Sequence, residues 1–322
     1  FHLSDPAQVS LEIYDGRDLL IRSVTSKGTL PAGENRLSWD VRDQAGRIVP
    51  AEAYTYAFQG RTSDGREVRY DLADATGGQA VAAREVKWDA QARLLSYVIE
   101  KPARVSVRFG LQDGGPLLRT LIDWVVRPGG LQREAWDGKD SSGVLDLASH
   151  PRLAIGVQAF SLPENSLIVG DPQTRVNLIE SLPGARQSRP HSTAARHMYD
   201  HAQQPLESRG DFTISLILPT DLRRSGDRLP IVSSTIPVRL DIAAADRARA
   251  IARRFEPVFF IDGQFAFENE VGFMPLTWNF DPAALNDGEH FLTVNLRGYE
   301  GNFGMATVKV LVAKSGTTRE KR

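Results

Sequence analysis

The chain has 322 residues, of which 41% are hydrophobic, and it contains no cysteine. It therefore has neither disulfide bridges nor thiolate ligands for a metal, and its length suits two or three domains. The 39 basic and 40 acidic residues leave a net charge of −1, which argues against nucleic acid as a partner. No apolar run approaches the ~18–20 residues that a membrane span requires.

The first residues of the chain have the pattern of a β-strand. Phe1 and Leu3 lead into residues 9–13, in which every second residue is apolar. Because few proteins start inside a strand, we expect an upstream segment, such as a signal peptide, a lipid anchor or a membrane helix. An arbitrary boundary at Phe1 is the alternative. Membrane contact is expected only through such a missing N-terminal anchor or through partners.

An internal repeat is the clearest signal in the sequence. Residues 6–11, Pro-Ala-Gln-Val-Ser-Leu, recur as residues 102–107, Pro-Ala-Arg-Val-Ser-Val. Residues 39–46, Trp-Asp-Val-Arg-Asp-Gln-Ala-Gly, recur as residues 136–143, Trp-Asp-Gly-Lys-Asp-Ser-Ser-Gly. Both motifs keep their order and nearly their spacing, which predicts two copies of one structural unit.

Each copy has the pattern of a small β-sandwich. Val9, Leu11 and Ile13 share one face of a strand, and residues 105–109 repeat this alternation. The tryptophan of the second motif ends a later strand, where its large ring would fill the core. The Asp-x-x-Asp-x-x-Gly after it suits a tight turn, because Asp accepts hydrogen bonds from nearby amides and Gly adopts positive φ.

These motifs, followed by Tyr-x-Tyr-x-Phe at residues 54–58, resemble the FlgD-like Ig repeat of bacterial exported proteins. The resemblance covers residues 1–60 well and residues 95–160 less well. It implies an Ig-like fold and a role as a spacer or docking module. It implies no catalytic activity.

The remaining segments give the domain organisation. Residues 86–99 read as a hairpin leading into the second copy, and residues 181–210 lose all apolar periodicity, as a linker does. Residues 243–254 are the one convincing helix, and the strands around them resemble other bacterial Ig-like domains. We therefore expect an all-β fold of three Ig-like β-sandwich domains in tandem with one short helix. The expected divisions are two FlgD-like sandwiches at 1–75 and 76–180, a linker at 181–210, a C-terminal Ig-like sandwich at 211–314 and a flexible tail at 315–322.

Candidate chemistry is sparse. His191, His197 and His201 lie within eleven residues and are weak candidates for a metal site, although a polar loop with solvated histidines is the favoured interpretation. The aspartate pairs of the repeated Trp-Asp motif favour turns over calcium, which needs more oxygen ligands. No nucleophile elbow, phosphate loop or dinucleotide motif is present. We expect no catalytic residues, no cofactor and no enzymatic activity.

Aromatic residues are the candidates for interaction. Trp124 lies in a continuous apolar run, and Tyr199 lies among the three histidines. Phe259 and Phe260 are adjacent, and Phe265 and Phe267 follow them closely. Any one of them could instead belong to a core.

These observations predict a structural subunit rather than an enzyme. We expect a non-catalytic scaffold of an exported or membrane-associated bacterial complex, in the periplasm or outside the cell, that docks other protein subunits. A periplasmic cap of an electron-transfer or photosynthetic complex and an envelope assembly are both compatible with this. The alternative is a carbohydrate-binding module of an extracellular enzyme system, with aromatic rings on one sandwich face.

Overall fold

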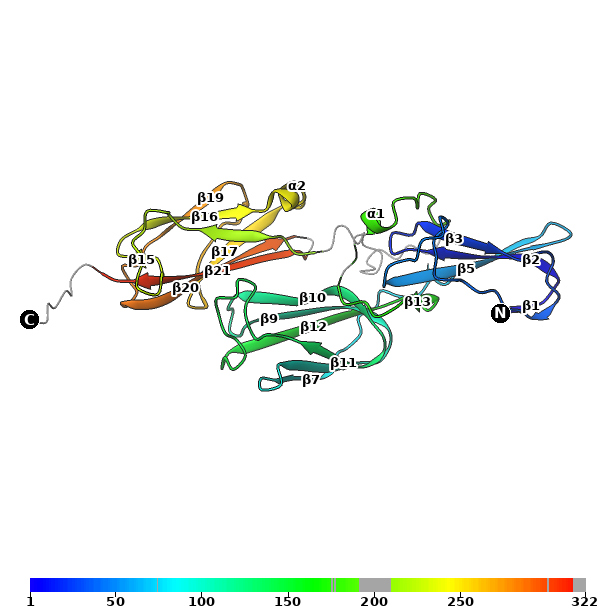
Figure 1. The fold of residues 1–322 in the computed structure, drawn as a ribbon, viewed down its shortest axis with the longest axis horizontal. Helices are drawn as coiled ribbons and strands as arrows, with labels where there is room; N and C mark the ends of the chain where they lie inside the picture. Colours follow the sequence, from blue (N-terminus) through cyan, green and yellow to red (C-terminus); the bar gives the residue numbers. More distant parts are fainter. Residues whose placement is uncertain (74, 175, 177, 191–209, 300, 315–322) are drawn as a thin grey trace, which may run out of the picture.

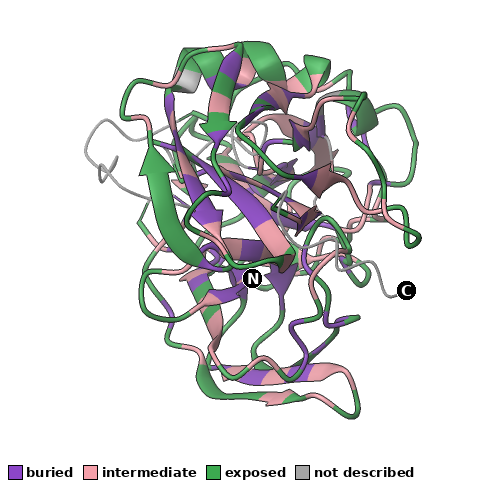
Figure 2. Ribbon diagram, turned by 90° about the vertical axis from the view of Figure 1, so that its left-hand side faces the viewer, coloured by how far each residue is buried: buried purple, intermediate pink, exposed green. Residues whose placement is uncertain are grey.

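The computed structural model describes residues 1–73, 75–174, 176, 178–190, 210–299 and 301–314. It has three β-sandwich domains, which confirms the predicted all-β fold class. In Figure 1 the first domain (blue) and the third (yellow to red) lie at opposite ends of the long axis, and the second (green) lies beside and between them. Buried residues gather on the strands inside the domains, and exposed residues gather in loops and at edges (Figure 2).

The first domain places a five-stranded sheet against a two-stranded one. The larger sheet has the order β13-β5-β2-β3, with β6 also paired to β5, and the smaller sheet is β1-β4. Strand β2 forms because its apolar residues alternate, which buries one face. The strands are β1 (His2–Leu3), β2 (Ala7–Tyr14), β3 (Leu20–Thr25), β4 (Gly33–Glu34), β5 (Ala53–Thr62), β6 (Glu67–Tyr70) and β13 (Ser166–Ile168).

The second domain is a more regular sandwich of two three-stranded sheets. Their orders are β10-β9-β12 and β11-β8-β7. The expected hairpin is present as β7 and β8, which form two strands of one sheet. The strands are β7 (Arg84–Asp89), β8 (Leu94–Ile99), β9 (Ala103–Leu111), β10 (Leu117–Arg127), β11 (Gly130–Ala135) and β12 (Leu153–Ser161).

The third domain packs a three-stranded sheet, β14-β16-β19, on a five-stranded sheet, β15-β21-β20-β17-β18. The predicted helix is α2 (Ala244–Arg253), which buries Ala250 in the core of this domain. The strands are β14 (Ile214–Ile217), β15 (Ile231–Val232), β16 (Ile236–Ile242), β17 (Phe255–Ile261), β18 (Gln264–Glu268), β19 (Leu276–Phe280), β20 (Gly288–Gly298) and β21 (Phe303–Val312).

The second domain ends earlier than the expected boundary at residue 180. After β12 the chain returns to the first domain, where β13 pairs with β5 and the short α1 (Leu178–Ser181) adds Leu178 to the core. Arg189 holds this return in place: its side chain is fully buried and forms ion pairs with Asp18 (3.0 Å) and Asp71 (2.5 Å). The first domain is therefore built from two separate stretches of chain, because an edge of β5 remains open for β13. Of the expected linker, residues 191–209 lie outside the described residues.

The domains contact one another through buried polar groups. Glu52 of the first domain and Arg104 of the second form an ion pair of 3.0 Å, with side chains 2% and 4% exposed. Between the second and third domains, the amide of Leu117 donates to Asn295 Oδ1 (2.7 Å), and Asn295 Nδ2 donates back to the Leu117 carbonyl (2.6 Å). These contacts fix the second domain against both neighbours.

Candidate functional site

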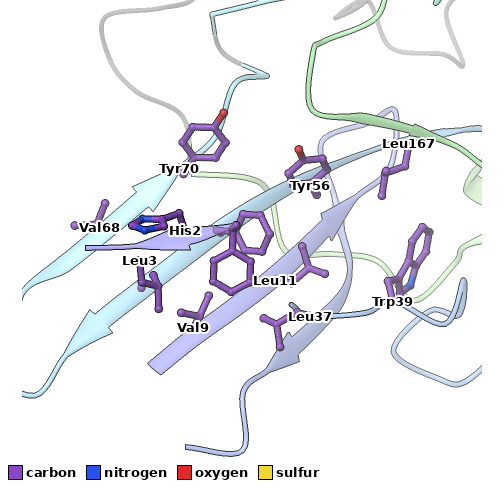
Figure 3. A pocket seen from close by; sticks show the side chains of 13 residues that line it. His2, Leu3, Val9, Leu11, Leu37, Trp39, Tyr56, Val68, Tyr70 and Leu167 are labelled. Atoms are coloured by element: carbon purple, nitrogen blue, oxygen red, sulfur yellow. The ribbon is translucent and has the colours of Figure 1, made fainter. Parts of the chain in front are cut away.

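The first domain has a solvent-open groove of about 790 Å³ over its large sheet. Val9 and Leu11 of β2 and Tyr56 of β5 form part of its floor (Figure 3). Trp39 and Tyr70 stand on opposite sides of it. The thirteen lining residues include no Asp, Glu, Lys or Arg, and one of them is His2, so the groove presents a mostly apolar surface.

Trp39 is positioned by the turn that follows it. Its indole Nε1 donates to the carbonyl of Arg42 at 2.8 Å, and its ring meets the edge of Tyr54 at a centroid distance of 5.5 Å. One face of the indole packs on the core, yet the side chain stays half-buried. The hydrogen bond to Arg42, three residues further along the chain, thus holds the indole ring at the groove.

The corresponding tryptophan of the second domain has the same local geometry but a different cover. Trp136 Nε1 donates to the carbonyl of Lys139 at 3.0 Å, three residues on, as in the first copy. Its ring stacks on Phe109 at 3.7 Å and lies 4.9 Å from Trp88 of β7, which leaves it 2% exposed. Strands β7 and β8 therefore cover the face that is open in the first domain.

In the alignment of the two copies, β1 corresponds to β8, but β1 is equivalent only to the last two residues of β8. Val98 and Ile99 of β8 pair with Leu131 and Gly130, as His2 and Leu3 pair with Glu34 and Gly33. Earlier in β8, residues 94–96 pair with residues 133–135. The first-domain equivalents of 133–135 are Arg36, Leu37 and Ser38, and no backbone hydrogen bond joins them to another described residue. An unpaired stretch of backbone therefore borders the groove.

The aspartates of the repeated motif shape turns. Asp43 Oδ1 accepts the amides of Ala45 and Arg47, each at 2.9 Å, and Asp140 Oδ1 accepts those of Val144 (2.6 Å) and Leu145 (2.8 Å). Burial opposes ionisation of Asp43, but hydrogen bonds from Arg47 outweigh it and lower the pKa of that carboxyl below its usual value. The turn-forming interpretation of these aspartates is confirmed.

The described residues contain no group of three or more His, Asp or Glu side chains placed to hold a metal ion. The histidine candidates His191, His197 and His201 lie outside the described residues, as does Tyr199. None of the helices in the described ranges is long and apolar enough to cross a membrane.

Two of the predicted interaction residues are buried. Phe259 is 0% exposed inside the third core, and Phe260 is 5% exposed on the other face of β17, where it pairs in register with the buried Thr293. The prediction that they form an exposed interaction surface is therefore wrong, because both side chains are buried. Trp124 is half-buried, with its ring 5.4 Å from that of Phe160.

The sequence reasoning missed the groove. Val9, Leu11 and Ile13 of β2 are buried, as their alternation predicts, and the groove opens beside them. Of the other aromatic candidates, Phe265 and Phe267 are 58% and 39% exposed, and Phe273, which the sequence pattern did not mark, is 53% exposed.

No protein-family model matches the sequence, and no curated protein sequence is significantly similar to it. Among solved structures, it is similar to a tetra-tandem repeat from the extending region of a large adhesion protein, with 14% identity over 98% of this chain and 69% of that chain and a TM-score of 0.22. The fibronectin(III)-like modules of Clostridium thermocellum CbhA match at 9% identity over 75% of this chain and 100% of theirs, with a TM-score of 0.22. A bacterial ice-binding adhesin matches at 11% identity over 96% and 87%, with a TM-score of 0.18. Likenesses this weak support no conclusion about what the chain binds.

Proposed function

We propose that this chain is a non-catalytic docking subunit of an exported or membrane-associated bacterial assembly, and that it binds another protein through the groove of its first domain. The groove carries the proposal. It is a concave, mostly apolar surface, and a patch of this kind on a folded protein marks an interaction site. The proposal includes an extracytoplasmic location.

The resemblance of the first two domains to FlgD-like Ig repeats is part of this proposal. Its support is the repeated tryptophan turn, in which both copies donate from the indole to the carbonyl three residues on. The groove lies over the large sheet of the first sandwich, which agrees with a spacer or docking role for such repeats.

The carbohydrate-binding alternative requires flat aromatic rings on an exposed sheet face. Trp136 is buried, and Trp39, Trp88, Trp124 and Trp278 are half-buried. Of these, Trp39 borders the groove, where a wall of apolar side chains favours a protein over a hydroxyl-rich ligand. Binding of soluble oligosaccharides at the groove would favour the alternative.

The test is site-specific photo-crosslinking in the native cells. Val68, 67% exposed, lines the groove, and Ile48, 71% exposed, lies in the same domain outside it. A benzophenone side chain at position 68 should give a discrete adduct with another polypeptide, and the same side chain at position 48 should not. Adducts that are equal at both positions, or absent from position 68, would overturn the proposal.

Substitution gives the matched readout. Val68→Ser together with Tyr70→Ser should reduce copurification of the crosslinked partner, while Ile48→Ser should leave it unchanged. All three side chains are largely exposed, so the variants keep the fold.

A further inference from the structure

Strand β12 of the second domain lies at an edge of the sheet β10-β9-β12, on a different domain from the groove. Its even-numbered residues direct their backbone groups to β9, because in the same register the amide of Leu162 donates to the Pro102 carbonyl at 2.9 Å. Its odd-numbered residues therefore direct theirs to the outer edge. At that edge, residues 79–81 cover only residues 159–161, through two hydrogen bonds of 2.9 Å.

The rest of this edge is open. Ile155 and Val157 form no backbone hydrogen bond to a described residue there, so each presents a free amide and a free carbonyl. Residues 153–158 contain no charged residue and no proline, and they pair with β9 without a bulge. Charges, prolines and bulges are the usual means by which an exposed edge avoids pairing. The edge strand β7 of the other sheet, in contrast, has a bulge between Arg84 and Lys87.

The first domain closes the equivalent edge with its own chain. Tyr56 and Phe58 of β5 take the positions that Ile155 and Val157 take in β12. The amide of Tyr56 donates to the carbonyl of Asn165 (3.1 Å), and Asn165 Nδ2 donates to the carbonyl of Tyr56 (2.6 Å). Phe58 pairs with strand β6. Polypeptide therefore covers this edge in the first copy, and the described residues leave it open in the second.

A recess of about 400 Å³ lies beside the open edge, on the outer face of the sheet. Arg108 is the one charged residue among those that line it, and it pairs in register with Gly156 of β12. Arg108 Nη2 donates to Asp211 Oδ1 (3.2 Å) and to the Gly301 carbonyl (3.4 Å), whereas Nη1 has no hydrogen-bond partner among the described residues. Because Gly156 has no side chain, nothing on β12 separates this guanidinium from the edge.

We propose that β12 accepts an extended segment of another protein, which pairs antiparallel with Ile155 and Val157 and places an acidic side chain over Gly156. An extended backbone supplies donors and acceptors at the spacing of alternate strand residues, which identifies the occupant as polypeptide. Phe303 of the third domain borders the recess, so the site suits a single narrow segment better than the broad edge of a second copy.

The two faces of the site set the side chains of this segment. Residues opposite Ile155 and Val157 share the inner face, where both of these side chains are half-buried against the core, so the partner residues are apolar. The residue between them points to the outer face and into the recess. There the free Nη1 of Arg108 favours a carboxylate, which forms a charge-assisted hydrogen bond with it.

The probe for direct binding is the peptide Thr-Thr-Val-Glu-Val-Thr-Thr, labelled with fluorescein and titrated with the full chain. Fluorescence anisotropy should show saturable binding, and replacing its Glu by Gln should weaken binding about tenfold. Gly156→Leu fills the path to Arg108 and should remove the preference for Glu over Gln. Gly226→Leu is the matched control, because this glycine also has room for a side chain, and it should leave the preference unchanged.

Val157→Pro tests the pairing itself. It removes an amide that has no partner in the described structure, which an edge strand tolerates, and it should abolish binding of both peptides. Val157→Thr keeps the amide and a similar volume, so it should bind as the unchanged chain does. Absence of peptide binding to the unchanged chain would overturn the proposal, as would binding that survives Val157→Pro.

Amide hydrogen exchange, read residue by residue, gives a second measurement. In the chain alone, Ile155 and Val157 should exchange fast, whereas Gly156 and Gln158, which bond to β9, should exchange slowly. The peptide should slow exchange at the first two and leave the last two unchanged. Slow exchange at Ile155 and Val157 without peptide would show that the edge is already covered and would overturn the proposal.

Crosslinking in the native cells tests whether another protein occupies the site. A benzophenone side chain at position 158, which is exposed and lines the recess, should give a discrete polypeptide adduct that Val157→Pro abolishes. The same side chain in place of Leu131, 51% exposed on β11, should give none. No adduct at position 158, or one that persists with Val157→Pro, would overturn the proposal. Val68→Ser with Tyr70→Ser should leave this adduct unchanged, so the groove and the β12 edge can fail separately.

Discussion

The two tryptophans of the repeat provide a matched pair of perturbations within one chain. Trp136 is 2% exposed and packed between Phe109 and Trp88, so Trp136→Ala should cost about 3–5 kcal/mol, as for a buried Trp that leaves a cavity. Trp39 has the same turn and the same indole hydrogen bond, but its site already opens into the groove. Without a closed cavity, Trp39→Ala should cost only about 1–2 kcal/mol.

The assay is urea unfolding monitored by hydrogen exchange in β2 and β9, because separate domains can unfold in separate transitions. Each variant should destabilise its own domain, and the cost at Trp136 should exceed that at Trp39 by about 2 kcal/mol. Equal costs would refute the conclusion that Trp39 is less tightly enclosed by the described residues than Trp136 is.

Three further predictions concern polar groups elsewhere. Glu52→Gln should lower the free energy of unfolding by about 3–5 kcal/mol, because it leaves Arg104 buried without a counter-charge. The double change Glu52→Leu with Arg104→Met should cost much less, because it removes both charges. Urea unfolding measures both variants, and a double variant as unstable as the single one would contradict this. Burial opposes protonation of His290, but its hydrogen bond to Asp262 (2.6 Å) outweighs it and raises the pKa of the imidazole. The folded-state pKa therefore exceeds the unfolded value of about 6.5, and the stabilisation is complete below that pH and is lost as pH rises through the folded pKa. His290→Gln should thus be more destabilising at about pH 5.5 than at about pH 8.5, which denaturation at both values checks. Arg189→Met should loosen the return segment of residues 163–190, detected as faster proteolysis there, whereas unchanged cleavage would show that β13 and α1 hold without it.

The repeat could be predicted from the sequence because its signals are local. Alternation along the first strand fixes which side chains face inward, and the Trp-Asp turn fixes its own hydrogen bonds within a few residues. These interactions need no information from distant parts of the chain. The sandwich fold and its turns therefore followed from the residues alone.

Trp124 shows where a local pattern misleads. The apolar run around it reads as a strand covered on both faces, whereas the register of β10 shifts between Ile122 and Val125 and Trp124 has φ of 55°. The bulge lets both Ile122 and Val125 point inward, so the continuous run comes from an irregular strand. A bulge depends on the partner strand and leaves no clear mark in the sequence.

The return of the chain to the first domain depends on long-range contacts. Strand β13 has three residues, and its partner β5 lies more than a hundred positions earlier. Arg189 is a polar residue in a polar stretch, yet the structure buries it completely against Asp18 and Asp71. The polar composition of such a stretch predicts a linker. Only the structure shows that the charge of Arg189 is paired with aspartates that lie far away in the sequence.

The groove depends on a local pattern, the apolar face of the strands, and on a long-range one, what covers that face. Comparison of the two copies of the repeat therefore locates it. If the first copy had adapted to an open face, polar side chains would have replaced the apolar ones of the floor. Instead, Tyr56 and Phe58 stand in register beside Ile13 and Leu11, where the covered second copy has Ile155 and Val157 beside Phe109 and Val107. Tyr56 and Phe58 are half-buried and Leu11 and Ile13 are buried, so the floor of the groove keeps the apolar character of a covered face. The two domains differ in their cover and hardly in the face beneath it, so the chemistry of the floor is that of a surface meant to be buried.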